Sequence, residues 1–385
     1  MMAIDYQAAS AMTAPAPAPP TTRDDTAQAA GQLVILVGPE DSLRAQAIAA
    51  GLAPRIEYRM IADQWAESQV EQWRPPAAGV PGGRLTGLRR TLPGNLVLAR
   101  QLARGLEPDS VVFSTGETWG IPLALVAAWR RHRSWAHVVY AHRLYSPRWQ
   151  RFLAAVRRHL AVDAWICATE HQAGLLRDVL GRTEHVHVVS PGVDTAFFAP
   201  AEASTAPERR YLLSVGAEMR NYPLLFEAVR DLPIDVIVKA SSAWMAASRE
   251  ALHAAPPNVQ VITERLSYTE LHALYAGAFA VVAPVQDTPQ AAGITTILEG
   301  MAMQKCVIAT RSRGLPDTLI HGETGIVCDA TPEALAAALS SALASPDVEA
   351  LALAGRRAVC RAASIEEHAR QVSSVLAKVL ASRVP

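Results

Sequence analysis

Residues 280–314 read AVVAPVQDTPQAAGITTILEGMAMQKCVIATRSRG. An apolar run stops at Pro284, a polar loop follows, and Gly293 opens a short helical segment that leads into a second apolar run. This order predicts two buried parallel strands joined by a helix. Gly293 lets the backbone pass close to a ligand, and the first amides of a helix lack partners within it and favour anions. The stretch therefore predicts a phosphate or diphosphate site at the mouth of the 295–303 helix.

Short apolar runs alternate with helical segments along the chain. Such runs are typical of a parallel sheet that helices cover on both faces. The expected strands fall within residues 32–41, 111–116, 137–142, 164–170 and 185–192, and then within 210–218, 234–242, 258–264, 278–285, 305–311 and 325–330. The predicted fold class is α/β, with two doubly wound domains in tandem. Because such sheets bind ligands outside the carboxyl ends of their strands, we expect the site in a central cleft that both domains face.

Changes of composition indicate the domain boundaries. Residues 1–30 include the run TAPAPAPPTTRDD, which cannot build a core, so we expect a disordered segment. Residues 31–200 form the predicted N-terminal domain, and the small, polar, Pro-containing stretch 201–209 forms the linker. Residues 210–360 form the predicted C-terminal domain. The last segment, 361–385, is a helix that could pack back on the N-terminal domain.

The charge of the chain limits the class of partner. The 385 residues include 36 Lys and Arg and 36 Asp and Glu, a formal net charge of zero. Proteins that bind nucleic acid usually present a clearly basic face, so no nucleic-acid partner is expected. Residues 143–158 (RLYSPRWQRFLAAVRR) are rich in Arg and contain no acid, which fits a solvated helix face or a peripheral contact with a membrane or an acidic substrate.

The cysteines and the hydropathy pattern favour a cytoplasmic protein. The four cysteines lack CxxC spacing, so we expect reduced core residues rather than disulfides or a zinc site. They are Cys167, Cys306, Cys328 and Cys360. No stretch reaches the ~18 uninterrupted apolar residues of a membrane-spanning helix, and no signal-peptide pattern is visible at the N-terminus.

Glu299 is the one acid in the predicted 295–303 helix, and two interpretations of it are open. Thr296 and Glu299 have the spacing of a capping box, in which the Glu only stabilises the start of the helix. Alternatively, Glu299 accepts two hydrogen bonds at once from the two hydroxyls of a ribose.

Three motifs at consistent spacing resemble one known family. They are SPGVDTAFFAP (190–200), LEGMA (298–302) and RGLPDTLIHGETGIVCD (313–329). Together they resemble the family 4 retaining glycosyltransferases, which have the GT-B fold of two Rossmann-like domains. The resemblance covers roughly residues 130–360 and is strongest in 258–330.

The resemblance implies a nucleoside diphospho-sugar donor on the C-terminal domain, an acceptor on the N-terminal domain, and transfer with retention at the anomeric carbon. Glu299 would hold the ribose, and the amides of Gly293, Ile294, Thr295 and Thr296 would hold the diphosphate. Backbone from Thr263 to Leu266 would meet the base. The acceptor is left open: a natural product, a lipid-linked molecule or a glycan.

The chain departs from the family pattern at the donor sugar. The family usually has an acid eight residues before the ribose Glu, and this position is Ala291 here. Gln290 precedes it and could replace the acid as a neutral amide. We therefore expect an unusual donor sugar, for example a deoxygenated hexose; impaired transfer is the alternative.

The cations that neutralise the diphosphate also differ. The family has an Arg and a Lys after the first strand of the C-terminal domain, where this chain has Ala217 and Pro223. Arg220 is the one cation in that loop, and Lys239 ends the next strand at the same sheet edge. Either could supply the positive charge that a departing diphosphate needs.

Polar strand ends in the first domain are the remaining candidates. His142 closes the run HVVYAH and matches the family position of a His near the transferred sugar. Glu117, the turn from Gly38 to Glu40, and the pair Thr169 and Glu170 are weaker candidates; capping of a helix explains this last pair equally well. No Asp-x-Asp motif occurs. The resemblance implies no bound metal and no cofactor apart from the nucleotide sugar as co-substrate.

Three other functions compete with a hexosyl- or deoxyhexosyltransferase. A nucleotide-sugar 2-epimerase would need acid and base pairs, and this site has few carboxylates. A dehydrogenase would need G-x-G-x-x-G after the first strand, where the chain has VGPEDS. A catalytically silent GT-B protein that acts as a binding partner is favoured by Ala217 and Ala291, and it would bind nucleotide without turnover.

Overall fold

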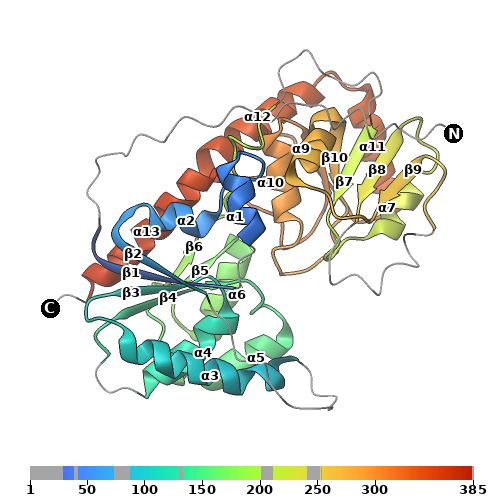
Figure 1. Cartoon of the computed structure of the whole chain (residues 1–385). Helices are drawn as coiled ribbons and strands as arrows, with labels where there is room; N and C mark the ends of the chain where they lie inside the picture. The colour runs from blue at the N-terminus through green and yellow to red at the C-terminus, as the bar shows by residue number, and fades with distance from the viewer. Residues whose placement is uncertain are drawn as a thin grey trace. The chain divides into compact units, whose positions relative to one another are not determined.

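A computed structural model describes residues 29–38, 42–72, 87–129, 133–200, 211–240, 252 and 254–383 (Figure 1). The predicted linker 201–209, nearly all of the predicted disordered segment 1–30, and the residues Pro39 and Glu40 lie outside these ranges. The chain forms two compact units, each built from separate segments.

The two units are named by their larger segments. The N-terminal unit contains Ile56–Val189 together with the described residues between Ala29 and Ser42 and the final segment from His368. The C-terminal unit contains Ser190–Glu367 together with Leu43–Arg55. Residues 43–55 therefore pack with the C-terminal unit, and the last helix packs mainly with the N-terminal unit. The boundaries predicted from composition stay predictions.

The N-terminal unit is built on a six-stranded sheet in the order β2-β1-β3-β4-β5-β6, with every neighbouring pair parallel. Its strands are β1 (Ala29–Val37), β2 (Trp65–Gln72), β3 (Val111–Ser114), β4 (Ala136–Ala141), β5 (Ala164–Cys167) and β6 (Val186–Val188). β2 was not among the expected strands. It is an edge strand whose residues after Trp65 are mostly exposed and polar, so it lacks the apolar run that announces a buried strand.

Helices cover both faces of this sheet (Figure 1). The helices are α2 (Glu57–Ala62), α3 (Gly87–Gly105), α4 (Glu117–Ala128), α5 (Pro147–Val156), the 3-10 turn η2 (Arg157–His159), α6 (Glu170–Leu180) and α13 (Ile365–Ala381). α3 to α6 pack on one face, where Leu123 and Leu153 belong to its buried clusters. α13 lies on the other face, where Trp65 Nε1 donates to Ser373 Oγ at 3.4 Å.

The C-terminal unit has a second parallel sheet of six strands, in the order β12-β11-β10-β7-β8-β9. Its strands are β7 (Tyr211–Val215), β8 (Asp235–Lys239), β9 (Val259–Ile262), β10 (Ala278–Ala283), β11 (Cys306–Thr310) and β12 (Ile326–Cys328). The chain runs outward from β7 to β9 and then returns to β10 on the other side of β7. Doubly wound sheets bind their ligands at such a reversal, outside the carboxyl ends of the two central strands.

Six helices in the described part of the chain accompany this sheet, and two of them begin at caps that the sequence predicts. They are α1 (Ser42–Ala49), α7 (Tyr222–Val229), α9 (Tyr268–Gly277), α10 (Ile294–Ala302), α11 (Pro332–Ala344) and α12 (Val348–Ala362). Ser267 and Glu270 form the predicted capping box of α9, and Thr331 caps α11 with Pro332 in its first turn. α7 and α11 pack on one face of the sheet, and α9 and α10 lie on the other (Figure 1).

The α/β class with two doubly wound sheets is therefore confirmed. The expectation of four core cysteines is wrong in part, because Cys167 and Cys306 are buried, Cys328 is half-buried and Cys360 is exposed on α12. Among the described residues, no helix is long and apolar enough to cross a membrane. No cluster of three or more His, Cys, Asp or Glu suited to a metal ion occurs in this part of the chain either.

Candidate nucleotide-sugar site

The mouth of α10 lies at the reversal of the second sheet. Gly293 precedes the helix with φ +80°, a conformation that favours glycine, and a Cβ there would lie only 2.9 Å from Val285 Cγ2. Within the described residues, the amides of Gly293, Ile294, Thr295 and Thr296 meet no acceptor. The turn therefore presents four unpaired N–H groups at the positive end of the helix dipole.

The capping-box interpretation of Glu299 is wrong. The helix begins at Ile294, so Glu299 lies in its second turn. Thr296 Oγ1 instead donates to Val215 O at 3.1 Å, at the end of β7. The carboxylate of Glu299 is thus not used to start the helix.

Arg220 lies directly at the mouth of α10. Its Nη2 donates to Thr296 Oγ1 at 3.0 Å, its Nε to Val215 O at 3.2 Å and its Nη1 to Glu218 O at 2.9 Å. A Cβ on Gly293 would lie 3.4 Å from Arg220 Nη1, so the guanidinium group lies against the glycine turn. Among the described residues no carboxylate forms an ion pair with it, and burial lowers its pKa. The group is a cation held by backbone carbonyls beside unpaired amides.

Glu299 is buried, with 7% of its surface exposed. Its Oε2 accepts a hydrogen bond from Tyr275 Oη at 2.7 Å. Burial raises the pKa of Glu299 to about 7, and the bond from Tyr275 opposes this effect. A carboxylate that is short of donors can gain hydrogen bonds from a ligand, which suits the vicinal hydroxyls of a pentose.

Gln290 and Ala291 belong to the loop that leads to α10, and both are half-buried. The loop is joined to the turn after β11: Ser312 Oγ donates to Gln286 O at 3.1 Å, and Thr288 N donates to Ser312 Oγ at 3.2 Å. A Cβ on Gly314 would lie 1.7 Å from Gln290 O, so only glycine fits there. The backbone N–H of Gln290 donates to Thr288 Oγ1 at 3.1 Å, so the loop has this bond without the family acid at the next position.

The other residues predicted to bind the sugar nucleotide lie at the carboxyl ends of β8 and β9. Lys239 ends β8 and is buried, which lowers its pKa; it does not extend freely into water. Lys239 O accepts from Gly216 N at 3.0 Å, which connects β8 to the loop of Arg220. Thr263 is exposed and Leu266 half-buried in the loop between β9 and α9.

His142 belongs to the N-terminal unit, where it follows β4 and is exposed. Its imidazole stacks on Tyr140 with ring centres 4.6 Å apart, and its Nε2 lies 2.9 Å from Thr115 O. A carbonyl only accepts, so Nε2 carries the proton and donates. Nδ1 is then the nitrogen through which a neutral His142 can accept a hydrogen bond from a sugar hydroxyl.

Two weaker candidates have structural roles in this unit. The Glu117 carboxylate accepts from the backbone N–H groups of His142 at 3.1 Å and Arg143 at 2.8 Å. Thr169 caps α6 by accepting from Gln172 N at 3.3 Å, and Glu170 pairs with Arg177 at 3.2 Å.

In the Arg-rich stretch 143–158, five arginines are exposed: Arg143, Arg148, Arg151, Arg157 and Arg158. Contact with a membrane stays a prediction.

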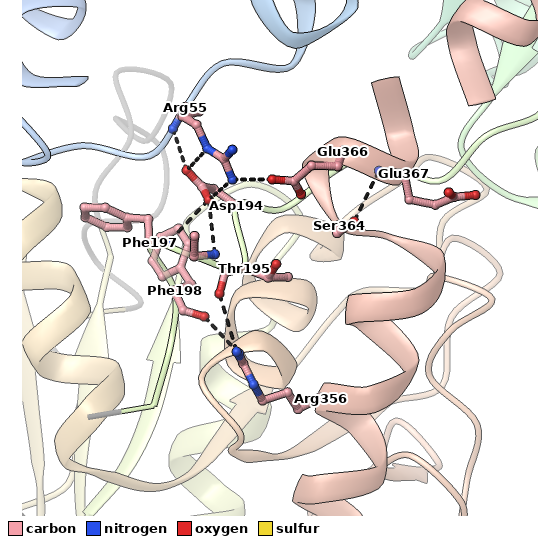
Figure 2. A network of polar contacts seen from close by, with 10 residues as sticks. Arg55, Asp194, Thr195, Phe197, Phe198, Arg356, Ser364, Glu366 and Glu367 are labelled. Atoms are coloured by element: carbon pink, nitrogen blue, oxygen red, sulfur yellow. Dashed lines mark hydrogen bonds and ion pairs between the residues drawn. The ribbon is translucent and has the colours of Figure 1, made fainter. Parts of the chain in front are cut away.

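The GVDT motif holds a turn of the C-terminal unit together (Figure 2). Asp194 receives both a backbone and a side-chain bond from Arg55 at its Oδ2, each at 2.9 Å, and a third from Arg55 Nη2 at its Oδ1 at 2.6 Å. Arg55 also pairs with Glu366 at 2.6 Å. Burial raises the pKa of Asp194, but the bonds from Arg55 outweigh this effect and hold it below its usual value. The motif is therefore structural in this chain.

Two family profiles match the two halves of the sequence. The profile described as Glycosyltransferase Family 4 matches residues 43–197, and the one described as Glycosyl transferases group 1 matches residues 201–358. The chain belongs to the family 4 glycosyltransferases. Among curated proteins, α-maltose-1-phosphate synthase of Mycolicibacterium smegmatis is 26% identical over 57% of this chain and 65% of the synthase. The chain thus spans just under two-thirds of that relative's length.

Solved glycosyltransferases share the fold of this family member. Sucrose-phosphate synthase of Thermosynechococcus elongatus superposes with a TM-score of 0.72 at 16% identity, over 91% of this chain and 100% of that chain. α,α-Trehalose 6-phosphate synthase of Burkholderia multivorans gives 0.68 at 15% identity, over 91% and 99%. Anabaena HepE, solved with UDP-glucose, gives 0.65 at 14% identity, over 90% and 99%. At these identities the likeness shows the GT-B fold.

Within the C-terminal unit the structure brings together Arg220, the turn from Gly293 to Thr296, and Glu299. Tyr275, which completes this group, was not predicted. Its one signal in the sequence is its place in the last turn of a helix, just before the strand that leads to the glycine turn. A tyrosine there is also typical of an ordinary core residue.

Proposed function

We propose that this family 4 glycosyltransferase moves a hexosyl or deoxyhexosyl group from a nucleoside diphospho-sugar to an acceptor hydroxyl, with retention and without a metal ion. One observation carries the proposal: Arg220 lies at the mouth of α10, 3.0 Å from Thr296, with the buried Glu299 one turn further along the helix.

The electrostatics of Arg220 favour an anionic ligand. A cation beside the positive end of a helix dipole is unfavourable, and burial adds to this cost. A diphosphate between the guanidinium and the unpaired amides would reverse both effects. The same groups would stabilise the charge that develops on the departing diphosphate, so no metal ion is needed for that role.

The remaining groups fit the two ends of the donor. Glu299 would accept from the ribose hydroxyls, and the loop from Thr263 to Leu266 would meet the base. Gln290 would face the transferred sugar, which favours a less hydroxylated hexose. The UDP-glucose bound by Anabaena HepE supports the same class of donor. His142 would bind the sugar or the acceptor, which is a natural product, a lipid-linked molecule or a glycan. The cytoplasm stays the predicted location.

A thermal-shift screen against UDP, GDP, ADP and dTDP tests nucleotide binding. A ligand at about 100 times its dissociation constant should stabilise the protein by about 2.7 kcal/mol. Arg220→Ala should abolish the shift. Arg311→Ala is the matched control, because Arg311 is an exposed arginine paired with Asp329. If none of the four nucleotides raises the melting temperature, the proposal is wrong.

Turnover is tested with the nucleotide that binds. Release of nucleoside diphosphate from its sugar conjugates, in the presence of hydroxyl acceptors and EDTA, is expected. The anomeric configuration of the product, read by proton NMR, should match that of the donor. Binding with no turnover of any sugar nucleotide would instead favour the silent binding partner.

A further inference from the structure

Tyr275 has no role in the proposed chemistry, yet among the described residues it makes the one hydrogen bond to the Glu299 carboxylate, at 2.7 Å. We propose that Tyr275 is a positioning residue, which fixes the carboxylate of Glu299 in the orientation that receives the donor ribose. This inference rests on the proposed function. A fixed carboxylate binds a diol more tightly than a free one, because the ligand does not have to order it.

Tyr275 is held at the end of an aromatic face on α9. Tyr268, His272 and Tyr275 follow each other at helical spacings of four and three residues and therefore share one face. His272 Nε2 lies 3.1 Å from Ala199 O, so this nitrogen donates to the carbonyl. Phe198 meets the ring of Tyr275 edge-on, with ring centres 5.9 Å apart. Tyr275 therefore packs against the turn that carries the GVDT motif.

Several hydrogen bonds hold this turn in place (Figure 2). Asp194 accepts from Arg55 and also from the backbone N–H groups of Ala196 and Phe197, each at 3.2 Å. Arg356 on α12 donates to the carbonyls of Thr195 and Phe198. The bonds fix the backbone that carries Phe198, and Tyr275 is fully buried against it. The hydroxyl of Tyr275 therefore has a defined place from which to hold Glu299.

The protonation states suit this role. Burial raises the pKa of Tyr275 well above its usual value, so its hydroxyl stays protonated and donates. The charged groups that act on the pair are Arg220, which favours ionised Tyr275, and the Glu299 carboxylate itself. Only Oε2 of Glu299 is engaged by Tyr275; within the described residues Oε1 has no hydrogen-bond partner. One oxygen is held by the protein and the other is left for the ligand.

Tyr275→Phe tests the proposal, because it removes one oxygen and keeps the ring against Phe198. Affinity for the nucleoside diphosphate that binds wild type, measured by calorimetry from pH 6 to 9, should fall about 10-fold at pH 7. The pKa of Glu299, read from its ¹³C carboxyl shift, should rise, because the carboxylate loses a donor. The affinity loss should then shrink at high pH.

Tyr211→Phe is the matched control, since it removes another buried tyrosine hydroxyl of the same unit, which donates to Leu274 O at 2.7 Å. It should leave both the affinity and the pKa of Glu299 unchanged. If Tyr275→Phe has the affinity and the carboxyl titration of wild type, Tyr275 is only a core residue. If wild type binds none of the nucleoside diphosphates, the proposed function fails instead, while the carboxyl titration still reports on the contact between Tyr275 and Glu299.

Discussion

Glu117 and Glu299 look alike by position and burial. Each belongs to a helix that follows a central strand of its sheet, and their exposed fractions are 6% and 7%. Their partners differ. Glu117 accepts two backbone N–H groups of the loop after β4, whereas Glu299 accepts one tyrosine hydroxyl. The number of hydrogen bonds that a buried carboxylate accepts from the protein, rather than its burial, therefore distinguishes a structural carboxylate from one that is available to a ligand.

The difference in donors has an energetic meaning. Backbone N–H groups that are left buried and unpaired cost free energy, so Glu117 stabilises the unit that contains it. Glu299 is buried with fewer hydrogen bonds to offset the loss of hydration of its charged form, and its pKa is raised for this reason. We interpret the cost as stability given up for a binding site. The following predictions test the contrast.

The largest expected effect concerns Glu117. Glu117→Ala should lower the free energy of unfolding by about 3–4 kcal/mol, because two hydrogen bonds to a charged acceptor are lost. Denaturant unfolding measures it, and the shift given by the bound nucleotide should persist in the variant. A loss below about 1 kcal/mol would show that the two backbone bonds do not stabilise the loop.

The second prediction is that Glu299→Gln stabilises the protein at high pH. Because the pKa of Glu299 is raised in the folded state, the folded protein binds the proton more tightly, and this contribution is lost as pH rises from about 4.5 to about 7. Gln does not titrate, so above pH 7 the variant should exceed wild type by up to about 3 kcal/mol, and the two should converge near pH 4. Unfolding curves between pH 4 and 8 measure the free energy of unfolding of both proteins. If the difference between wild type and variant does not change with pH, the raised pKa is contradicted.

The third prediction concerns nucleotide affinity. Glu299→Gln should weaken binding about 10-fold at pH 8, or about 1.4 kcal/mol, because the amide replaces one acceptor oxygen by a donor. Glu117→Gln is the control and should leave the affinity unchanged. Calorimetry with the nucleotide from the screen measures both. Equal losses in the two variants would remove the contrast between the glutamates.

The smallest expected effect concerns Thr169, a third polar residue at a strand end. Thr169→Ala should cost about 1 kcal/mol by removing the cap of α6. Thr169→Ser should recover most of this loss, because it keeps the hydroxyl. Neither change should alter nucleotide affinity; an effect of Thr169→Ala on affinity would mean that this residue also belongs to the binding site.

Part of the fold could be predicted because its signals are local. The apolar runs of β10 and β11 and the cap at Ser267 depend on neighbouring residues, and the structure has them within a few residues of the predicted ranges. β2 was missed because an exposed edge strand needs no apolar run. The place of residues 43–55 in the C-terminal unit was also missed. One contact that joins this segment to the unit is the pair of Arg55 and Asp194, which lies 139 positions later in the chain.

By itself, the sequence determined the α/β class, the family and the glycine turn before α10, because apolar periodicity and the conformational freedom of glycine are properties of short segments. Only the tertiary structure decided which polar residues belong together. Arg220 bonds to Thr296, 76 positions away in the sequence, and Tyr275 bonds to Glu299, 24 positions away. Glu117 accepts hydrogen bonds from backbone N–H groups at the end of another strand. The physical reason is that a side chain's hydrogen-bond partners are set by the packing of the sheet, which brings distant segments together, and local sequence carries no record of them.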